Sequence, residues 1–100
     1  MDNVGALLND ISRMPELASV DRRATSFLND VAEIYERHGP GTTRAYLLTQ
    51  QFRRRLEAPL LLKVLDKFEA CPEVRLNRSI GRTIIKCLFE LRELKGGARR

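Results

Sequence analysis

The apolar residues of this chain recur every three or four positions over nearly its whole length. That spacing places them on one face of an α-helix, whereas a half-buried strand would alternate apolar and polar residues. It predicts helices over about residues 3–13, 20–38, 43–58, 60–70 and 77–94. Short connections between helices favour antiparallel neighbours. The predicted fold is therefore all-α, a small bundle of antiparallel helices.

Two helix-breaking steps divide this pattern. Gly39-Pro40-Gly41 is the clearest, because glycine suits the end of a helix and proline cannot continue its hydrogen-bond ladder. Pro59 is expected to form a kink or a tight joint between two helices. With 100 residues the chain has the length of one domain, which we expect to span residues 1–95, followed by a flexible basic tail at 96–100. Pairing with a second copy would stabilise so small a domain.

The predicted helix at 43–58 combines an apolar stripe with basic flanks. On a helical wheel, four apolar residues fall on one side, which we expect to face the core. They are Ala45, Leu48, Phe52 and Leu56. The flanking guanidinium groups offer planar forks of donors that suit phosphate oxygens. The candidate phosphate-binding residues are Arg44, Gln51, Arg53 and Arg55 on these flanks, and Gln50 and Arg54 opposite the apolar side.

The positive charge is unevenly distributed along the chain. The formal net charge is +5, but residues 1–43 carry net −3 and residues 44–100 carry net +8. Fourteen of the 18 basic residues are arginine. A basic half on a small helical chain points to a polyanionic partner, whereas a solvated basic surface is the simpler alternative.

The predicted last helix has apolar residues on two faces. One face carries the stripe expected to meet the core, and the opposite face combines arginines with Ile85 and Phe89. This second face is either a dimer or partner interface, or the sign of a helix buried on two sides within one domain. Its residues are Arg78, Arg82, Ile85, Phe89 and Arg92.

The sequence offers little for catalysis. His38 is the only histidine, and Cys71 and Cys87 lack metal-binding spacing. We find no glycine-rich phosphate loop and no nucleophile paired with a base. We therefore expect no enzyme activity, no metal site and no cofactor. The absence of a signal sequence and of a long apolar run predicts an intracellular protein with free thiols and no membrane partner.

Two segments resemble a known viral family. Residues 55–65, Arg-Leu-Glu-Ala-Pro-Leu-Leu-Leu-Lys-Val-Leu, are similar to the end of the second helix of the small nodavirus RNA-silencing suppressors, which carry a Leu-x-x-Pro step followed by apolar residues. Residues 7–15 resemble their opening helix, which ends in an aliphatic residue and proline. The resemblance implies an antiparallel homodimer with a flat four-helix surface. In the host cytoplasm that surface would bind double-stranded RNA and shield it from Dicer-type cleavage.

The same resemblance places the RNA contacts on the long second helix, at the six candidate residues named above, and allows host silencing proteins as further partners. Physical considerations favour the same ligand. Duplex RNA is recognised by its shape through phosphate and 2′-hydroxyl contacts, which suits a rigid face of Arg and Gln without stacking aromatic rings.

One rival function stays open. Ser79-Ile80-Gly81 resembles a step in the helical N-terminal domain of transcription elongation factors, which docks short acidic and hydrophobic peptides. The alternative is accordingly a protein-interaction module, of that type or another adaptor, that uses the face around Ile85 and Phe89. Binding of this kind would respond much less to salt than RNA binding would.

Overall fold

The computed structural model describes residues 3–97, with side chains described as far as Leu94. Seven α-helices and two short 3₁₀ helices form this part of the chain. They are α1 (Asn3–Ser12), η1 (Pro15–Ser19), η2 (Arg22–Ala24), α2 (Thr25–His38), α3 (Pro40–Thr49), α4 (Glu57–Glu69), α5 (Pro72–Leu76), α6 (Arg78–Lys86) and α7 (Leu88–Gly97). No strand occurs among residues 3–97, so the all-α prediction is confirmed.

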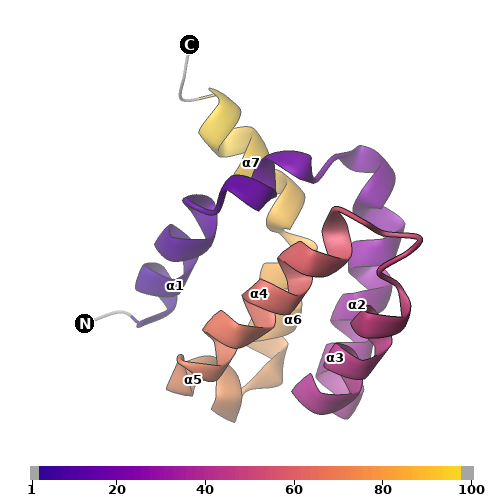
Figure 1. The fold of residues 1–100 in the computed structure, drawn as a ribbon. Helices are drawn as coiled ribbons and strands as arrows, with labels where there is room; N and C mark the ends of the chain where they lie inside the picture. The colour runs from indigo at the N-terminus through magenta and orange to yellow at the C-terminus, as the bar shows by residue number, and fades with distance from the viewer. Residues whose placement is uncertain (1–2, 98–100) are drawn as a thin grey trace.

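The helices pack around one core. α2 lies along α6, and α3 folds back against α2 and α4 (Figure 1). α1 lies at one edge, against α4, α5 and α7. The described molecule is flat, with extents of 40 × 37 × 17 Å. The largest fully buried side chains come from most of the helices and include Ile11, Leu17, Leu28, Tyr35, Leu47, Leu60, Leu61, Leu65, Phe68, Ile85 and Leu88.

The turn between α2 and α3 confirms the predicted break at Gly39. Gly39 has φ +88° and ψ −177°, a conformation that residues with a side chain rarely adopt. Its N–H donates to the Tyr35 carbonyl at 2.9 Å, and its own carbonyl accepts from the Thr43 hydroxyl at 2.7 Å. Pro40 then takes the first position of α3, where its missing N–H costs nothing.

The prediction of one helix over residues 43–58 is wrong. α3 ends at Thr49, residues 50–56 form a non-helical connection, and α4 begins at Glu57. Pro59 is the third residue of α4, so the two helices are joined before it, by residues 50–56, and not by a tight joint at Pro59. In a continuous helix, its ring would clash with the carbonyl oxygen four residues earlier, at Arg55. The apolar spacing runs through the break and therefore conceals it.

The last predicted helix is also divided. Cys87 separates α6 from α7, although the buried Ile84 and Leu88 keep the helical spacing across it. The short helices η1 and α5 were not expected, because five residues are too few to establish a period. α7 continues to Gly97, past the stop predicted at Gly96. Residues 98–100 of the predicted tail lie outside the described part.

Candidate functional site

The connection between α3 and α4 holds most of the predicted phosphate-binding residues. Gln50, Gln51, Arg53, Arg54 and Arg55 all lie in it, and in Figure 1 it projects at the right of the molecule. Arg53 and Arg55 are exposed, and neither forms an ion pair with a carboxylate of the described residues. Two guanidinium groups are thus available to an anion.

Backbone hydrogen bonds hold this connection in place. The N–H groups of Arg53 and Arg54 donate to the carbonyl oxygen of Gln50, with N···O distances of 3.1 and 2.8 Å. The Ala58 N–H donates to the Arg54 carbonyl at 2.9 Å, which ties the connection to the start of α4. The exposed side chains are therefore presented from a fixed backbone.

Arg54 has a different role from its two neighbours. Its guanidinium lies 4.9 Å from the centre of the Phe27 ring in α2, and the Phe27 ring packs against Tyr46 of α3 with 6.3 Å between ring centres. The side chain is half-buried. The wheel had placed Arg54 opposite the core, which is wrong because the helix ends before this residue. Arg54 packs the connection against α2, so Arg53 and Arg55 are the two arginines of the connection whose guanidinium groups form no hydrogen bond, ion pair or ring contact with the described residues.

Arg44 is engaged within the molecule. One of its guanidinium nitrogens lies 2.6 Å from an Asp66 carboxylate oxygen of α4. This ion pair joins α3 to α4 and competes with any phosphate for the same donors. Gln50 accepts the two backbone bonds through its carbonyl, and its side chain lies beside the Thr49 hydroxyl at 3.4 Å. The structure therefore does not bring Arg44 and the arginine triplet together as one open face.

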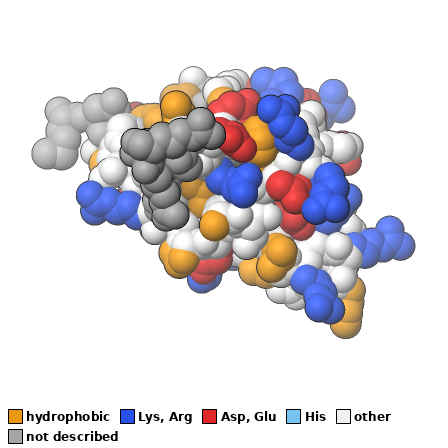
Figure 2. All heavy atoms as spheres, turned by 90° about the horizontal axis from the view of Figure 1, so that it is seen from above, with side chains coloured by type: hydrophobic (Ala, Val, Ile, Leu, Met, Phe, Trp, Pro, Cys, Tyr) orange, Lys and Arg blue, Asp and Glu red, His pale blue; other side chains and the backbone are white. Residues whose placement is uncertain are grey.

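The expected core stripe of this segment is exposed. Phe52 is 93% exposed, and Leu48 and Leu56 are more than half exposed. The residues that α3 buries are Thr43 and Leu47 instead. Ala45 and Leu48 of α3, and Phe52 and Leu56 of the connection, are thus exposed. The expectation of an Arg and Gln face without a stacking aromatic ring is therefore wrong. Figure 2 shows Lys and Arg side chains near exposed hydrophobic ones at the right-hand end, where Figure 1 has the α3–α4 connection.

The second predicted face, on the last helix, does not exist as an open surface. Ile85 is 0% exposed and belongs to the core, so the helix is buried on two sides. Phe89 is half-buried, with the Arg22 guanidinium 5.0 Å from the centre of its ring. Arg92 pairs with Glu93 of its own helix at 3.5 Å. An interface that needs Ile85 is therefore excluded by its burial.

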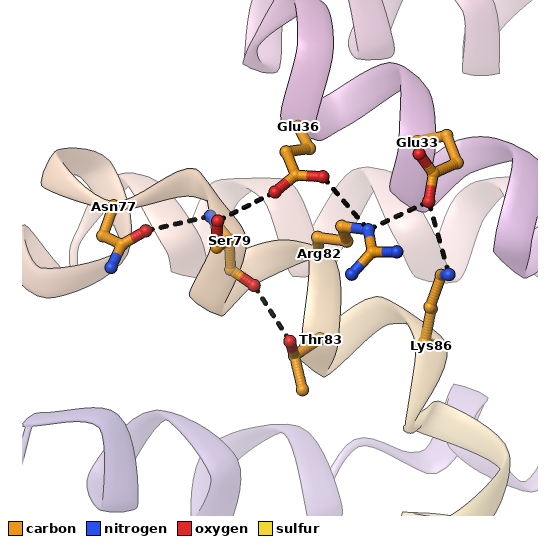
Figure 3. A network of polar contacts seen from close by, with 7 residues as sticks. All are labelled: Glu33, Glu36, Asn77, Ser79, Arg82, Thr83 and Lys86. Atoms are coloured by element: carbon orange, nitrogen blue, oxygen red, sulfur yellow. Dashed lines mark hydrogen bonds and ion pairs between the residues drawn. The ribbon is translucent and has the colours of Figure 1, made fainter.

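Arg82 joins α6 to α2 (Figure 3). Its Nε lies 2.9 Å from a Glu33 carboxylate oxygen and 3.1 Å from one of Glu36, and Lys86 reaches Glu33 at 3.3 Å. The Ser79 hydroxyl donates to Glu36 at 2.8 Å. Hydrogen bonds from Arg82 and then Lys86 lower the pKa of Glu33 from its ordinary value. These charges hold two helices together.

An apolar groove lies on the other side of α6. It has a volume of about 430 Å³, and α1 forms one wall while α6 and the start of α7 form the other. Its apolar lining is Val4, Leu8, Ile80, Ile84, Cys87 and Leu91. The sequence pattern identified the α6 stripe but assigned it wholly to the core. Pairing with α1, which leaves most of this lining half-buried, is a property of the tertiary arrangement.

Other kinds of site find no support in the described part of the chain. No group of three His, Cys, Asp or Glu residues there could hold a metal ion. None of the helices in residues 3–97 is both long and apolar enough to cross a bilayer. Comparison with protein-family models, curated proteins and solved structures gave no match to this chain.

Proposed function

We propose that this protein binds double-stranded RNA without sequence preference and shields it from Dicer-type cleavage. The observation that supports RNA binding is the pair of exposed, unpaired guanidinium groups of Arg53 and Arg55 on a backbone-fixed connection. Arginine binds phosphate through two parallel hydrogen bonds, and phosphate contacts carry no sequence information. Gln51, exposed beside them, adds a donor and an acceptor for a 2′-hydroxyl group.

One chain alone offers a small contact. Two free arginines neutralise few phosphates, and affinity for nucleic acid rises with the number neutralised. We propose a homodimer, in which two such connections contact one duplex and each raises the effective concentration of the other. Sedimentation equilibrium at increasing protein concentration tests the dimer.

The proposal is tested by removing Arg53 and Arg55. A mobility-shift titration compares duplex RNA, duplex DNA and single-stranded RNA of equal length at two salt concentrations. The R53A/R55A variant should bind duplex RNA more weakly. The slope of log affinity against log salt should fall by about one unit for each arginine that contacts a phosphate.

A second double variant that removes the same charge elsewhere distinguishes a specific RNA-binding site from a general effect of positive charge. Arg37 and Arg75 are exposed residues of α2 and α5, outside the α3–α4 connection, and neither forms an ion pair with a carboxylate of the described residues. R37A/R75A removes the same charge and should bind nearly as wild type does. An equal loss of RNA affinity in both double variants would mean that RNA binds any part of a generally basic surface and not a site at Arg53 and Arg55. Arg54 is kept intact, because it supports the connection.

The groove beside α6 favours a second candidate, a protein-interaction module. A groove of this volume with an almost wholly apolar lining suits the apolar face of a partner helix. Selection of helical peptides on the intact protein tests it. Binding should be lost in Leu91→Glu, retained in R53A/R55A and insensitive to salt. Peptides that bind Leu91→Glu as tightly as wild type would rule out the groove as their binding site.

A further inference from the structure

The side chain of Phe52 is almost fully exposed, and its ring packs against no other aromatic ring of the described residues. It is 93% exposed, and the ring pairs of the described residues are Phe27 with Tyr46 and Tyr35 with Phe68. Leu48 and Leu56, four residues before and four residues after it, are also exposed. A soluble chain leaves a ring of this size in water at a cost in free energy, which contact with a ligand would recover.

Backbone hydrogen bonds fix the position from which the Phe52 ring, here called the platform, reaches solvent. Gln50 accepts hydrogen bonds from Arg53 and Arg54, so Phe52 lies inside a closed turn. Arg54 holds that turn against Phe27. Arg53 and Arg55 follow Phe52 within three residues, a reach of at most about 10 Å. The backbone positions that carry a flat apolar group and two cations thus lie within the span of one or two nucleotides.

We infer that Phe52 stacks on an unpaired base of bound RNA while Arg53 and Arg55 contact the adjoining phosphates. This inference rests on the proposed RNA binding and names which RNA the site prefers. Every base has a π-face, so stacking on a ring is independent of sequence. Inside a duplex both faces are covered by neighbouring pairs. Unpaired nucleotides, such as an overhang at a duplex end, leave them open.

The charge around Phe52 favours RNA over a second copy of this chain. A two-fold interface places the same patch against itself. Arg53 and Arg55 of one copy would then approach the same residues of the other, and no carboxylate of the described residues pairs with either. Like charges brought together at an interface oppose association. A polyanion with flat rings complements both the charge and the apolar surface.

The chain contains no tryptophan, which makes the inference directly observable. Phe52→Trp places the sole indole at the platform. Its fluorescence should fall when short oligouridine is added, and fall far less with a long blunt-ended RNA duplex, in which every base is paired. Leu76→Trp is the control, because Leu76 is exposed on α5, away from the connection. A Leu76→Trp signal that changes equally would overturn the inference.

Affinity measurements on the full chain then separate the two proposals. Phe52→Ala should weaken binding of oligouridine and of a duplex with overhangs by about five- to 150-fold, and leave the binding of a long blunt-ended duplex little changed. Phe52→Tyr should retain binding, whereas Phe52→Leu should not. Circular dichroism checks that each Phe52 variant is folded. We expect no loss of structure, because this side chain is exposed and is not part of the core.

Each contrary outcome has a distinct meaning. If Phe52→Ala binds every RNA as wild type does while R53A/R55A does not, the stacking inference fails and RNA binding stands. If wild type binds no RNA, both fail. If Phe52→Ala converts a dimer to a monomer, Phe52 contacts a second copy of the chain and the inference is overturned. If wild type does not bind oligouridine but binds phosphatidylserine vesicles, and Phe52→Ala abolishes that binding, Phe52 contacts a membrane and the inference is likewise overturned.

Discussion

Gly39 occupies a backbone conformation in which a side chain would be strained. Its φ is +88°, and a Cβ atom there would lie 2.5 Å from a guanidinium nitrogen of Arg78. Gly39→Ala should therefore destabilise the protein by about 1–3 kcal/mol, mostly from backbone strain, since the Arg78 side chain can move. The midpoint of urea unfolding, with the m-value held constant, measures this effect.

Gly41 provides the matched control two residues away. It lies inside α3, and a Cβ atom there would meet nothing within 4 Å. Gly41→Ala should raise stability by about 0.4–1 kcal/mol, because Gly41 has helical backbone angles that alanine also adopts, and alanine loses less backbone entropy on folding. If both variants were stabilised, the strain assigned to Gly39 would be wrong.

Helices α2 and α6 pack at a distance that Gly81 allows. A Cβ atom at Gly81 would lie 2.5 Å from Cε2 of Tyr35 and 3.1 Å from Cε2 of Phe68, two rings packed edge to face with 5.4 Å between centres. Gly81→Ala should cost about 1–3 kcal/mol through overpacking, despite the better helix propensity of alanine. Thermal unfolding followed by circular dichroism checks it, with the exposed Thr83→Ala in the same helix as control.

The same pair of helices should make stability depend on acidity. Hydrogen bonds from Arg82 and Lys86 lower the pKa of Glu33 below its ordinary value of 4.5. A carboxyl group with a lowered pKa in the folded state stabilises that state above its unfolded pKa. The contribution is lost as the pH falls from about 4.5 through the lower folded value.

Glu33→Gln isolates this contribution. The variant should be less stable than wild type at neutral pH, and the difference should shrink as the pH drops below 4.5. Urea midpoints across the acid range measure it. Asp30→Asn, an exposed position on the same helix outside the network, is the control. A Glu33→Gln difference that stays constant with pH would contradict the role given to the carboxylate.

At the scale of the whole molecule, the helices share one core and should unfold together. Tyr35 in α2, Phe68 in α4 and Ile85 in α6 are buried in the same cluster. No group of helices in residues 3–97 has a separate core. Near-ultraviolet circular dichroism, which reports the surroundings of Tyr35, should change at the same denaturant concentration as the far-ultraviolet helical signal. Separate transitions would reveal independent units.

Local chemistry along the chain is sufficient for much of this architecture. Apolar spacing predicted the all-α fold, and Gly39 ends α2 because of its backbone conformation. Pro59 is accommodated in the first turn of α4, where its missing N–H costs no hydrogen bond. The position of the arginine triplet was not predicted in this way, because Arg53, Arg54 and Arg55 lie in the connection after α3 and not on a helix. The family resemblance and the proposed dimer stay predictions.

Which faces are buried was decided by the tertiary structure. The stripe of Leu48, Phe52 and Leu56 satisfies helical spacing, but α3 buries Thr43 and Leu47, since that side meets α2 and α4. A periodic pattern identifies apolar faces and does not say which neighbour will cover them. Burial needs a second surface, and only packing supplies it. For that reason Phe52 reaches solvent, Ile85 enters the core, and Arg54 rests on a ring from another helix.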